Sequence, residues 1–111
     1  MRRYVPKPID TSRVRLTKNL VKLRERLAEN AHDHWARMRF EEGWEPGTAR
    51  DERGKRNPNL VPYRRLGESE KRYDRVAAME TLKAILALGY RISRVRRNAL
   101  RGRSKPGRKR G

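Results

Sequence analysis

The apolar residues of this chain fall in three segments, and their distribution constrains the fold more than any other feature. They cluster in residues 14–44, 60–66 and 73–92, with few elsewhere. Only 34% of the 111 residues are hydrophobic and 40% are charged, which is near the limit at which a chain still folds. A chain of this length forms one domain with a modest core. We therefore expect these three segments to supply that core.

The first segment predicts a long helix. Its apolar residues recur every three or four positions, and they are Leu20, Leu23, Leu27, Ala31, Trp35 and Met38. Thr17 is a suitable N-cap, and the helix should end before Gly43. Ahead of it, Val14 and Leu16 alternate with arginine, so we expect an extended entry with a short strand.

The last segment predicts a second helix that begins near Glu68 or Ser69. Its inner side should carry Tyr73, Val76, Ala77, Glu80, Leu82, Ile85, Leu86 and Leu88. Gly89 suits the left-handed conformation that often follows the end of a helix.

The region between the two helices predicts a long loop. Residues 43–59 are rich in Gly, Pro, Asn and charge, and Trp44 is the residue best suited to hold them in place. Residues 60–63 predict an edge strand, because Pro62 has no N–H to donate, and residues 90–92 predict another short strand. The predicted fold class is therefore α+β, mainly α: two packed helices joined by a long loop, with short β-strands.

Positive charge is concentrated at the C-terminal end. The net charge is +18, and residues 91–111 contribute +10 of it, from 10 Lys and Arg with no acidic residue. This tail, which we expect to be flexible from residue 93, predicts salt-sensitive binding to nucleic acid or an acidic partner, with a simply solvated tail as the alternative. The candidate polyanion-binding residues are Arg94, Arg96, Arg97, Arg101, Arg103, Lys105, Arg108, Lys109 and Arg110.

Two absences from the sequence restrict where the protein is expected to act. The longest apolar run, residues 84–89, is too short for a signal peptide or a membrane span. The chain has no cysteine, which excludes disulfides and thiolate zinc sites. We expect a cytoplasmic or virion-associated protein that is neither secreted nor membrane-spanning.

Both histidines and both tryptophans lie within residues 27–44. His32 and His34 are about 200° apart on a helix, so they cannot bind one metal together. Glu29 and His32 share a face with the spacing of di-metal helical bundles, but no second copy of this motif exists. No nucleophile motif accompanies His32. We expect a core histidine, no metal, no cofactor and no enzymatic activity; a hydrolase that uses His32 with Glu29 or Asp33 is the weaker alternative.

Four motifs follow one another along the chain in an order that is informative. They are DTSRVRL, LAENAHDHWARMRFEEGW, GTARDERGKRNPNLVPYRRL and EKRYDRVAAMETLKAILALGY. In order and spacing they resemble the ryanodine-receptor repeat, or RyR domain, family over about residues 4–92. His34 and residues 93–111 stand outside the pattern. The resemblance implies an RyR-type domain in residues 1–92, followed by the basic tail.

The resemblance also implies a function. In calcium-release channels such repeats form tandem pairs that act as scaffold and regulatory modules, so a lone copy is expected to be a homodimeric binding module. Its ligand would be a protein or a nucleotide-like small molecule. A nucleic-acid-binding protein that uses its tail and basic surface without sequence specificity is the alternative function.

Seven residues are candidates for binding a ligand: His32, Trp35, Trp44, Arg50, Asp51, Tyr63 and Tyr73. Together they offer stacking faces, a cation and an acceptor, which suit a purine and its phosphates. The alternative is that the aromatic residues among them form a closed core.

Overall fold

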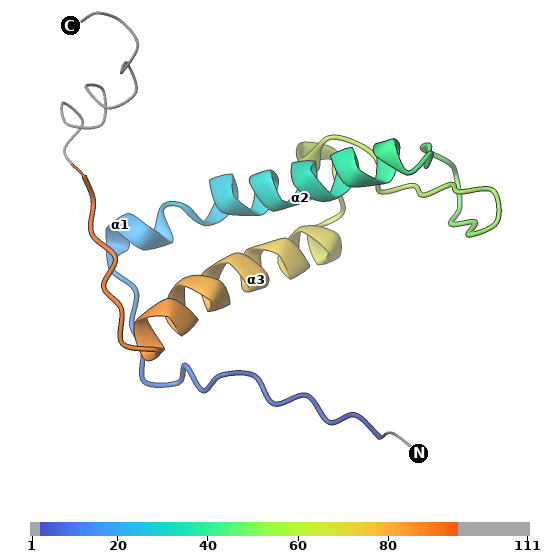
Figure 1. The fold of residues 1–111 in the computed structure, drawn as a ribbon. Helices are drawn as coiled ribbons and strands as arrows, with labels where there is room; N and C mark the ends of the chain where they lie inside the picture. The colour runs from blue at the N-terminus through green and yellow to red at the C-terminus, as the bar shows by residue number, and fades with distance from the viewer. Residues whose placement is uncertain (1–2, 96–111) are drawn as a thin grey trace, which may run out of the picture.

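The computed structural model describes residues 3–95, in which two long helices pack side by side (Figure 1). In chain order, the elements are α1 (Lys18–Val21), α2 (Arg24–Glu41), the 3-10 helix η1 (Tyr63–Arg65) and α3 (Glu68–Ala87). Helices α2 and α3 run in opposite directions, and the segment between them passes around one end of the pair (Figure 1). Two packed helices joined by a long loop were predicted, and this part of the fold is confirmed.

The first predicted helix is divided in two. Thr17 caps α1 as expected, because its Oγ1 accepts a hydrogen bond from Leu20 N at 3.3 Å. The chain then tightens: Leu23 N donates to Leu20 O, three residues back, before Leu27 N donates to Leu23 O, four residues back. A three-residue hydrogen bond is the narrower 3-10 geometry, and this turn separates α1 from α2.

Both long helices end at the predicted glycines. Helix α2 ends at Glu41, just before Gly43 with a φ of 93°, and α3 ends at Ala87, just before Gly89 with a φ of 98°. These φ values lie in the left-handed region, which glycine enters without steric cost.

The predicted short strands are wrong. In the described part of the chain, residues 14–16, 60–63 and 90–92 form no strand, and the β-structure consists of isolated bridges within residues 45–56. Each of the three runs lacks an adjacent strand with which to pair. The fold is therefore mainly α.

Residues 60–66 show why a turn replaces the expected strand. Leu60, Tyr63 and Leu66 are all buried, at a spacing of three residues. That spacing places side chains on one side of a 3-10 turn, whereas a strand would alternate them between two faces. Leu66 N accordingly donates to Tyr63 O at 3.0 Å, which closes η1.

The core is small and lies where η1 packs against α2. The buried hydrophobic residues are Ala28, Trp44, Leu60, Tyr63 and Leu66. Ala28 is fully buried and forms one cluster with Tyr63 and Leu66, because its methyl group lets η1 lie close to the backbone of α2.

Helix α3 contributes no buried residue, which corrects the predicted inner side. Tyr73, Val76 and Leu88 are 74%, 47% and 63% exposed, and Ala77 and Glu80 are exposed as well. Leu82, Ile85 and Leu86 are half-buried.

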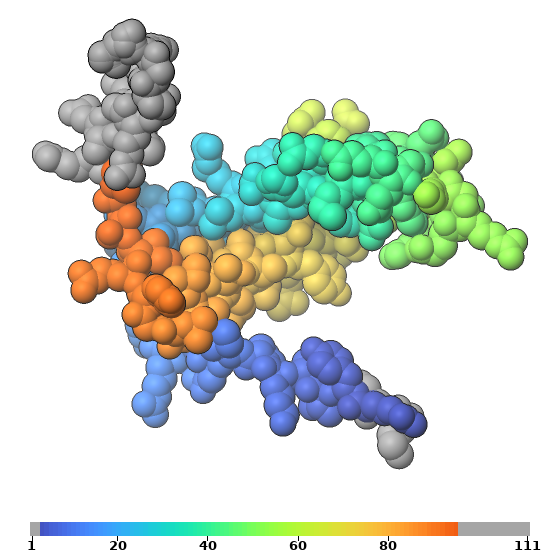
Figure 2. All heavy atoms as spheres, in the orientation of Figure 1, coloured from blue at the N-terminus to red at the C-terminus, as the bar shows by residue number. Residues whose placement is uncertain are grey.

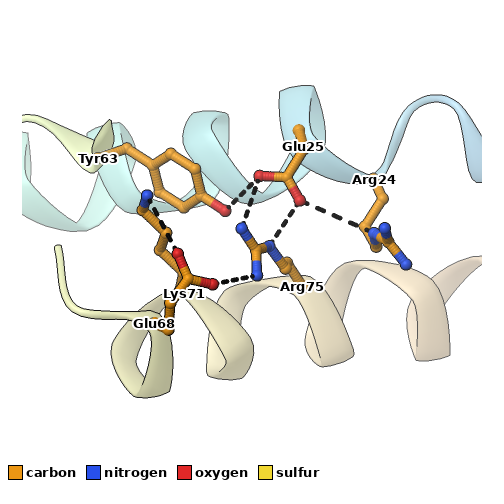
Figure 3. Close-up of polar contacts among 6 residues, drawn as sticks. All are labelled: Arg24, Glu25, Tyr63, Glu68, Lys71 and Arg75. Carbon is orange, nitrogen blue, oxygen red and sulfur yellow. Dashed lines mark hydrogen bonds and ion pairs between the residues drawn. The ribbon is translucent and has the colours of Figure 1, made fainter. Parts of the chain in front are cut away.

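A polar network joins α2, η1 and α3 (Figure 3). Arg75 on α3 donates from Nη2 to Glu25 Oε1 at 3.2 Å and from Nη1 to Glu68 Oε1 at 3.0 Å. Its Nε also forms an ion pair with the other oxygen of Glu25. The hydroxyl of Tyr63 donates to Glu25 Oε1 at 2.9 Å, so one carboxylate on α2 receives groups from both η1 and α3.

The network shifts the pKa values of its members. Hydrogen bonds from Arg75 hold the pKa of Glu25 and that of Glu68 below the ordinary value for glutamate. Burial, reinforced by the hydrogen bond to Glu25, raises the pKa of Tyr63. The hydrogen bond to Glu25, followed by that to Glu68, raises the pKa of Arg75.

Acidification should therefore weaken the domain through this network. A carboxyl with a lowered folded-state pKa stabilises the fold above its unfolded pKa, and this contribution is lost as the pH falls through the folded pKa. The free energy of unfolding should thus decline below pH 4.5, the ordinary pKa of these glutamates. Arg75→Gln should make the decline shallower, because it returns both carboxyls toward that ordinary pKa. Urea titrations between about pH 3 and pH 6 measure the slope.

Arg72→Gln is the matched control, because Arg72 lies on the same helix, is exposed and makes no ion pair within residues 3–95. It should retain the pH dependence of the unaltered protein. A curve for Arg75→Gln that runs parallel to that of the unaltered protein would contradict the role of the network.

Candidate ligand-binding site

His32, near the middle of α2, anchors the chain segment that precedes η1. Its side chain is buried, and its Nε2 donates to the backbone oxygen of Val61 at 2.7 Å. The imidazole also lies near two aromatic rings, with centroid distances of 5.5 Å to Trp35 and 6.3 Å to Tyr63. The partner of His32 is thus a carbonyl and not Glu29, which is exposed. The expectation of a core histidine agrees with this position.

A pocket of about 270 Å³ opens beside His32. Four of the seven candidate residues line it: His32 and Trp35 from α2, Arg50 from the connecting segment and Tyr73 from α3. Their meeting at one pocket joins three parts of the chain that are distant in sequence.

The other three candidates lie elsewhere. Trp44 is buried, and the guanidinium of Arg39 lies 5.2 Å from the centre of its ring. Tyr63 is part of the core cluster on Ala28. Asp51 is exposed on the connecting segment. For Trp44 and Tyr63, the closed-core alternative describes their place in the fold.

The connecting segment, residues 43–59, is held by contacts within itself and with the end of α2. Lys55 Nζ donates to the backbone oxygen of Glu42 at 2.7 Å, and the backbone N–H of Glu45 donates to the backbone oxygen of Lys55 at 2.9 Å. A Cβ atom at Gly47 would lie only 2.7 Å from the Cβ of Arg56, so the two arms of the segment touch at a site that only glycine fits. These contacts hold in place the segment that supplies Arg50, which is exposed, and Asn57, which is buried, to the lining of the pocket.

The sequence did not point to five further lining residues, which are Asn57, Asn59, Leu66, Glu70 and Asp74. Glu70 and Asp74 are four residues apart, a spacing that places both on one face of a helix and could have signalled a shared site. Asp74 is half-buried, and burial raises its pKa, while the nearby His32 acts in the opposite direction. The charged lining is thus two carboxylates and one guanidinium.

The arrangement suits a ligand with a flat face and N–H groups. Trp35 and Tyr73 offer aromatic faces, and the carboxylates of Glu70 and Asp74 can only accept hydrogen bonds when ionised. Arg50 is the cation of the pocket, and its Nε donates to Glu52 at 2.7 Å.

The structure bears on the remaining predictions about metal, catalytic and polyanion-binding residues only where they fall within residues 3–95. Among residues 3–95, no group of three or more His, Cys, Asp or Glu side chains could hold a metal ion. Asp33 and Glu29, the partners of His32 in the hydrolase alternative, are both exposed. Arg94 is exposed, and the remaining eight candidates for polyanion binding lie outside the described residues. Within the described chain, no helix combines the length and apolar character needed to cross a membrane.

Replacing His32 should destabilise the domain, because it removes a buried hydrogen bond and leaves a cavity. We expect His32→Ala to lower the free energy of unfolding by about 2–3 kcal/mol in urea denaturation. His34→Ala is the matched control on the same helix, since His34 is exposed and contacts Arg37 at 3.2 Å. It should change stability by less than about 0.5 kcal/mol. Equal losses from the two variants would refute the anchoring role of His32.

Comparison with known protein families agrees with the resemblance of the motifs. The sequence model of the RyR domain family matches residues 4–94 of this chain. The match spans α1, α2, η1, α3 and every residue that lines the pocket. Membership of such a family suggests an interaction module in general terms. This chain belongs to the RyR domain family.

Proposed function

We propose that this protein is a non-enzymatic binding module whose pocket holds a nucleotide-like small molecule. The observation that carries the proposal is the convergence of His32, Trp35, Arg50 and Tyr73 on one pocket. Family membership supports a binding role in general.

The volume of the pocket limits which part of such a ligand enters it. At about 270 Å³ it lies just below the range of about 300–1,000 Å³ common for sites that enclose a small molecule. The base would therefore enter, stacked on Trp35 and Tyr73, with its N–H groups directed at Asp74 or Glu70. The sugar and phosphates would remain at the mouth, where the exposed guanidinium of Arg50 can exchange Glu52 for a phosphate.

The chemistry of the pocket favours binding over catalysis. The Nε2 of His32 is already hydrogen-bonded to a backbone carbonyl, so it is not placed to take a proton from a nucleophile. The chain has no cysteine, and no serine or lysine lines the pocket.

Removing the exposed stacking face should weaken binding without unfolding the protein. We expect Tyr73→Ala to raise the dissociation constant for a nucleotide about tenfold, as loss of one base–aromatic stack does elsewhere. Isothermal titration with adenosine and guanosine mono- and diphosphates measures it. Tyr90→Ala is the matched control, because Tyr90 is 71% exposed and lies outside the pocket. Equal affinity of the two variants, or no binding of any nucleotide at millimolar concentration, would reject the proposal.

That the protein forms a homodimer remains a prediction, which derives from the tandem pairs of repeats in calcium-release channels. Light scattering on the full chain tests it directly.

The basic tail supports a second candidate function, contact with nucleic acid in the cytoplasm or in a virion. Residues 96–111 hold eight Lys and Arg and no acidic residue. The full chain should bind a short DNA duplex more tightly than residues 1–95 do. Its log–log salt slope should be about −0.9 for each phosphate neutralised. Equal binding by the shorter chain would move the contact to the folded surface, and no binding by either at moderate salt would remove this function.

A further inference from the structure

Helix α3 is only partly covered by the rest of the described structure. The helix has 20 residues, none of them buried. Figure 2 shows the N-terminal segment standing apart from α3, with open space between them. Thr11 joins the two where its Oγ1 donates to Glu80 Oε1 at 2.7 Å.

Two pockets with shared lining residues lie between α3 and the elements α1 and α2, and we call them together the α3 groove. The larger, of about 610 Å³, runs along α3 from Glu68 to Lys83. The smaller, of about 340 Å³, is lined by residues 14–16 together with residues of α1, α2 and α3. They share Arg24, Met79 and Lys83. The stretch from Glu68 to Lys83 is about 22 Å long at 1.5 Å per residue, the length of a helix of about 15 residues.

The α3 groove is lined by both apolar and basic side chains. The apolar lining residues are Val14, Leu16, Val21, Val76 and Met79, and the basic lining residues are Arg15, Arg24, Arg72, Arg75 and Lys83. Two acidic residues, Glu68 and Glu80, also line it, so five positive and two negative side chains leave a net charge of +3.

Two of the five basic side chains are available to a partner. The other three already have acidic neighbours: Arg75 is held by Glu25 and Glu68, Arg24 lies 3.8 Å from Glu25, and Lys83 lies 3.6 Å from Glu80. Arg15 and Arg72, by contrast, form no ion pair with any other residue of the described chain.

We infer that the α3 groove binds an acidic amphipathic helix of a partner protein. Such a helix would lay its apolar side chains on Val76 and Met79, which removes aliphatic surface from water. Its carboxylates would meet Arg15 and Arg72, one at each end of the groove.

The lining favours a peptide over nucleic acid. No aromatic side chain lines the α3 groove, so it offers no platform on which bases could stack. A phosphate backbone carries a charge at every nucleotide and would meet Glu68 and Glu80. A peptide can place neutral residues opposite those two carboxylates.

Charge also disfavours a second copy of this chain as the occupant. In a two-fold dimer the same patch faces itself across the axis. The α3 groove, with its net charge of +3, would then face an identical positively charged groove. An acidic partner would instead bring negative charge to this positively charged groove.

A designed helix tests the inference on the full-length protein. The probe is a fluorescein-labelled peptide of about 15 residues made of Leu, Glu and Ala, with leucines spaced i, i+4, i+7 and i+11 and glutamates on both flanks. Fluorescence anisotropy gives the dissociation constant. The titration is run at about 0.15 M salt, where long-range attraction between the two net charges is screened. Arg72→Glu should weaken binding about fivefold to tenfold, and Val76→Asp by at least as much.

Matched controls separate the α3 groove from the overall charge. Arg53→Glu makes the same change in net charge at an exposed site outside the groove, and Val95→Asp does so for the apolar change, since Val95 is 51% exposed. Both should leave binding within about twofold of the unaltered protein, and a scrambled peptide should bind more weakly.

Three results would overturn the inference. The first is equal weakening by Arg72→Glu and Arg53→Glu, or equal affinity for the scrambled peptide, which would reduce binding to bulk charge. The second is displacement of the peptide by a single-stranded oligonucleotide whose own affinity falls with Arg72→Glu, which would assign the groove to nucleic acid. The third is dimerisation that Val76→Asp abolishes, which would assign it to a second copy.

Discussion

The carboxylate of Glu25 is the contact on which the rest of the structure depends. It receives the hydroxyl of Tyr63 and the guanidinium of Arg75, so a single side chain of α2 binds both η1 and α3 (Figure 3). The Tyr63 ring can reach this carboxylate because Ala28, one turn further along α2, leaves room for η1 against the helix. Within residues 3–95 the core has five buried hydrophobic residues, none of them on α3, so these polar contacts add to a small apolar core in joining the elements.

The position of the pocket depends on three residues on one face of α2, which hold the chain at two points. Glu25, Ala28 and His32 are separated by three and four residues, which aligns them on that face. The first two hold η1, and the third holds the oxygen of Val61, so the segment before α3 is fixed at both of its ends. With that segment fixed, the first turns of α3 must bring Glu70, Tyr73 and Asp74 beside Trp35.

The two surfaces that we interpret differ in charge, and this difference assigns them to different ligands. The pocket has two carboxylates and one guanidinium in a chain whose net charge is +18, so its lining is an exception to the protein as a whole. The α3 groove is positively charged, like the protein as a whole, and has apolar lining residues as well. A flat molecule with N–H groups suits the first, and an acidic helix suits the second.

The sequence by itself determined the features that arise between neighbouring residues. The spacing of Leu27 and Trp35, the Thr17 cap and the glycines at 43 and 89 located the helices, because periodicity and capping act within a few residues. The tertiary structure alone decided which faces are covered. It turned residues 60–66 into a 3-10 turn against Ala28, left Tyr73 exposed at the pocket, and brought Asp74 to His32. Such outcomes depend on which distant segment packs on a residue, and no local pattern records that choice.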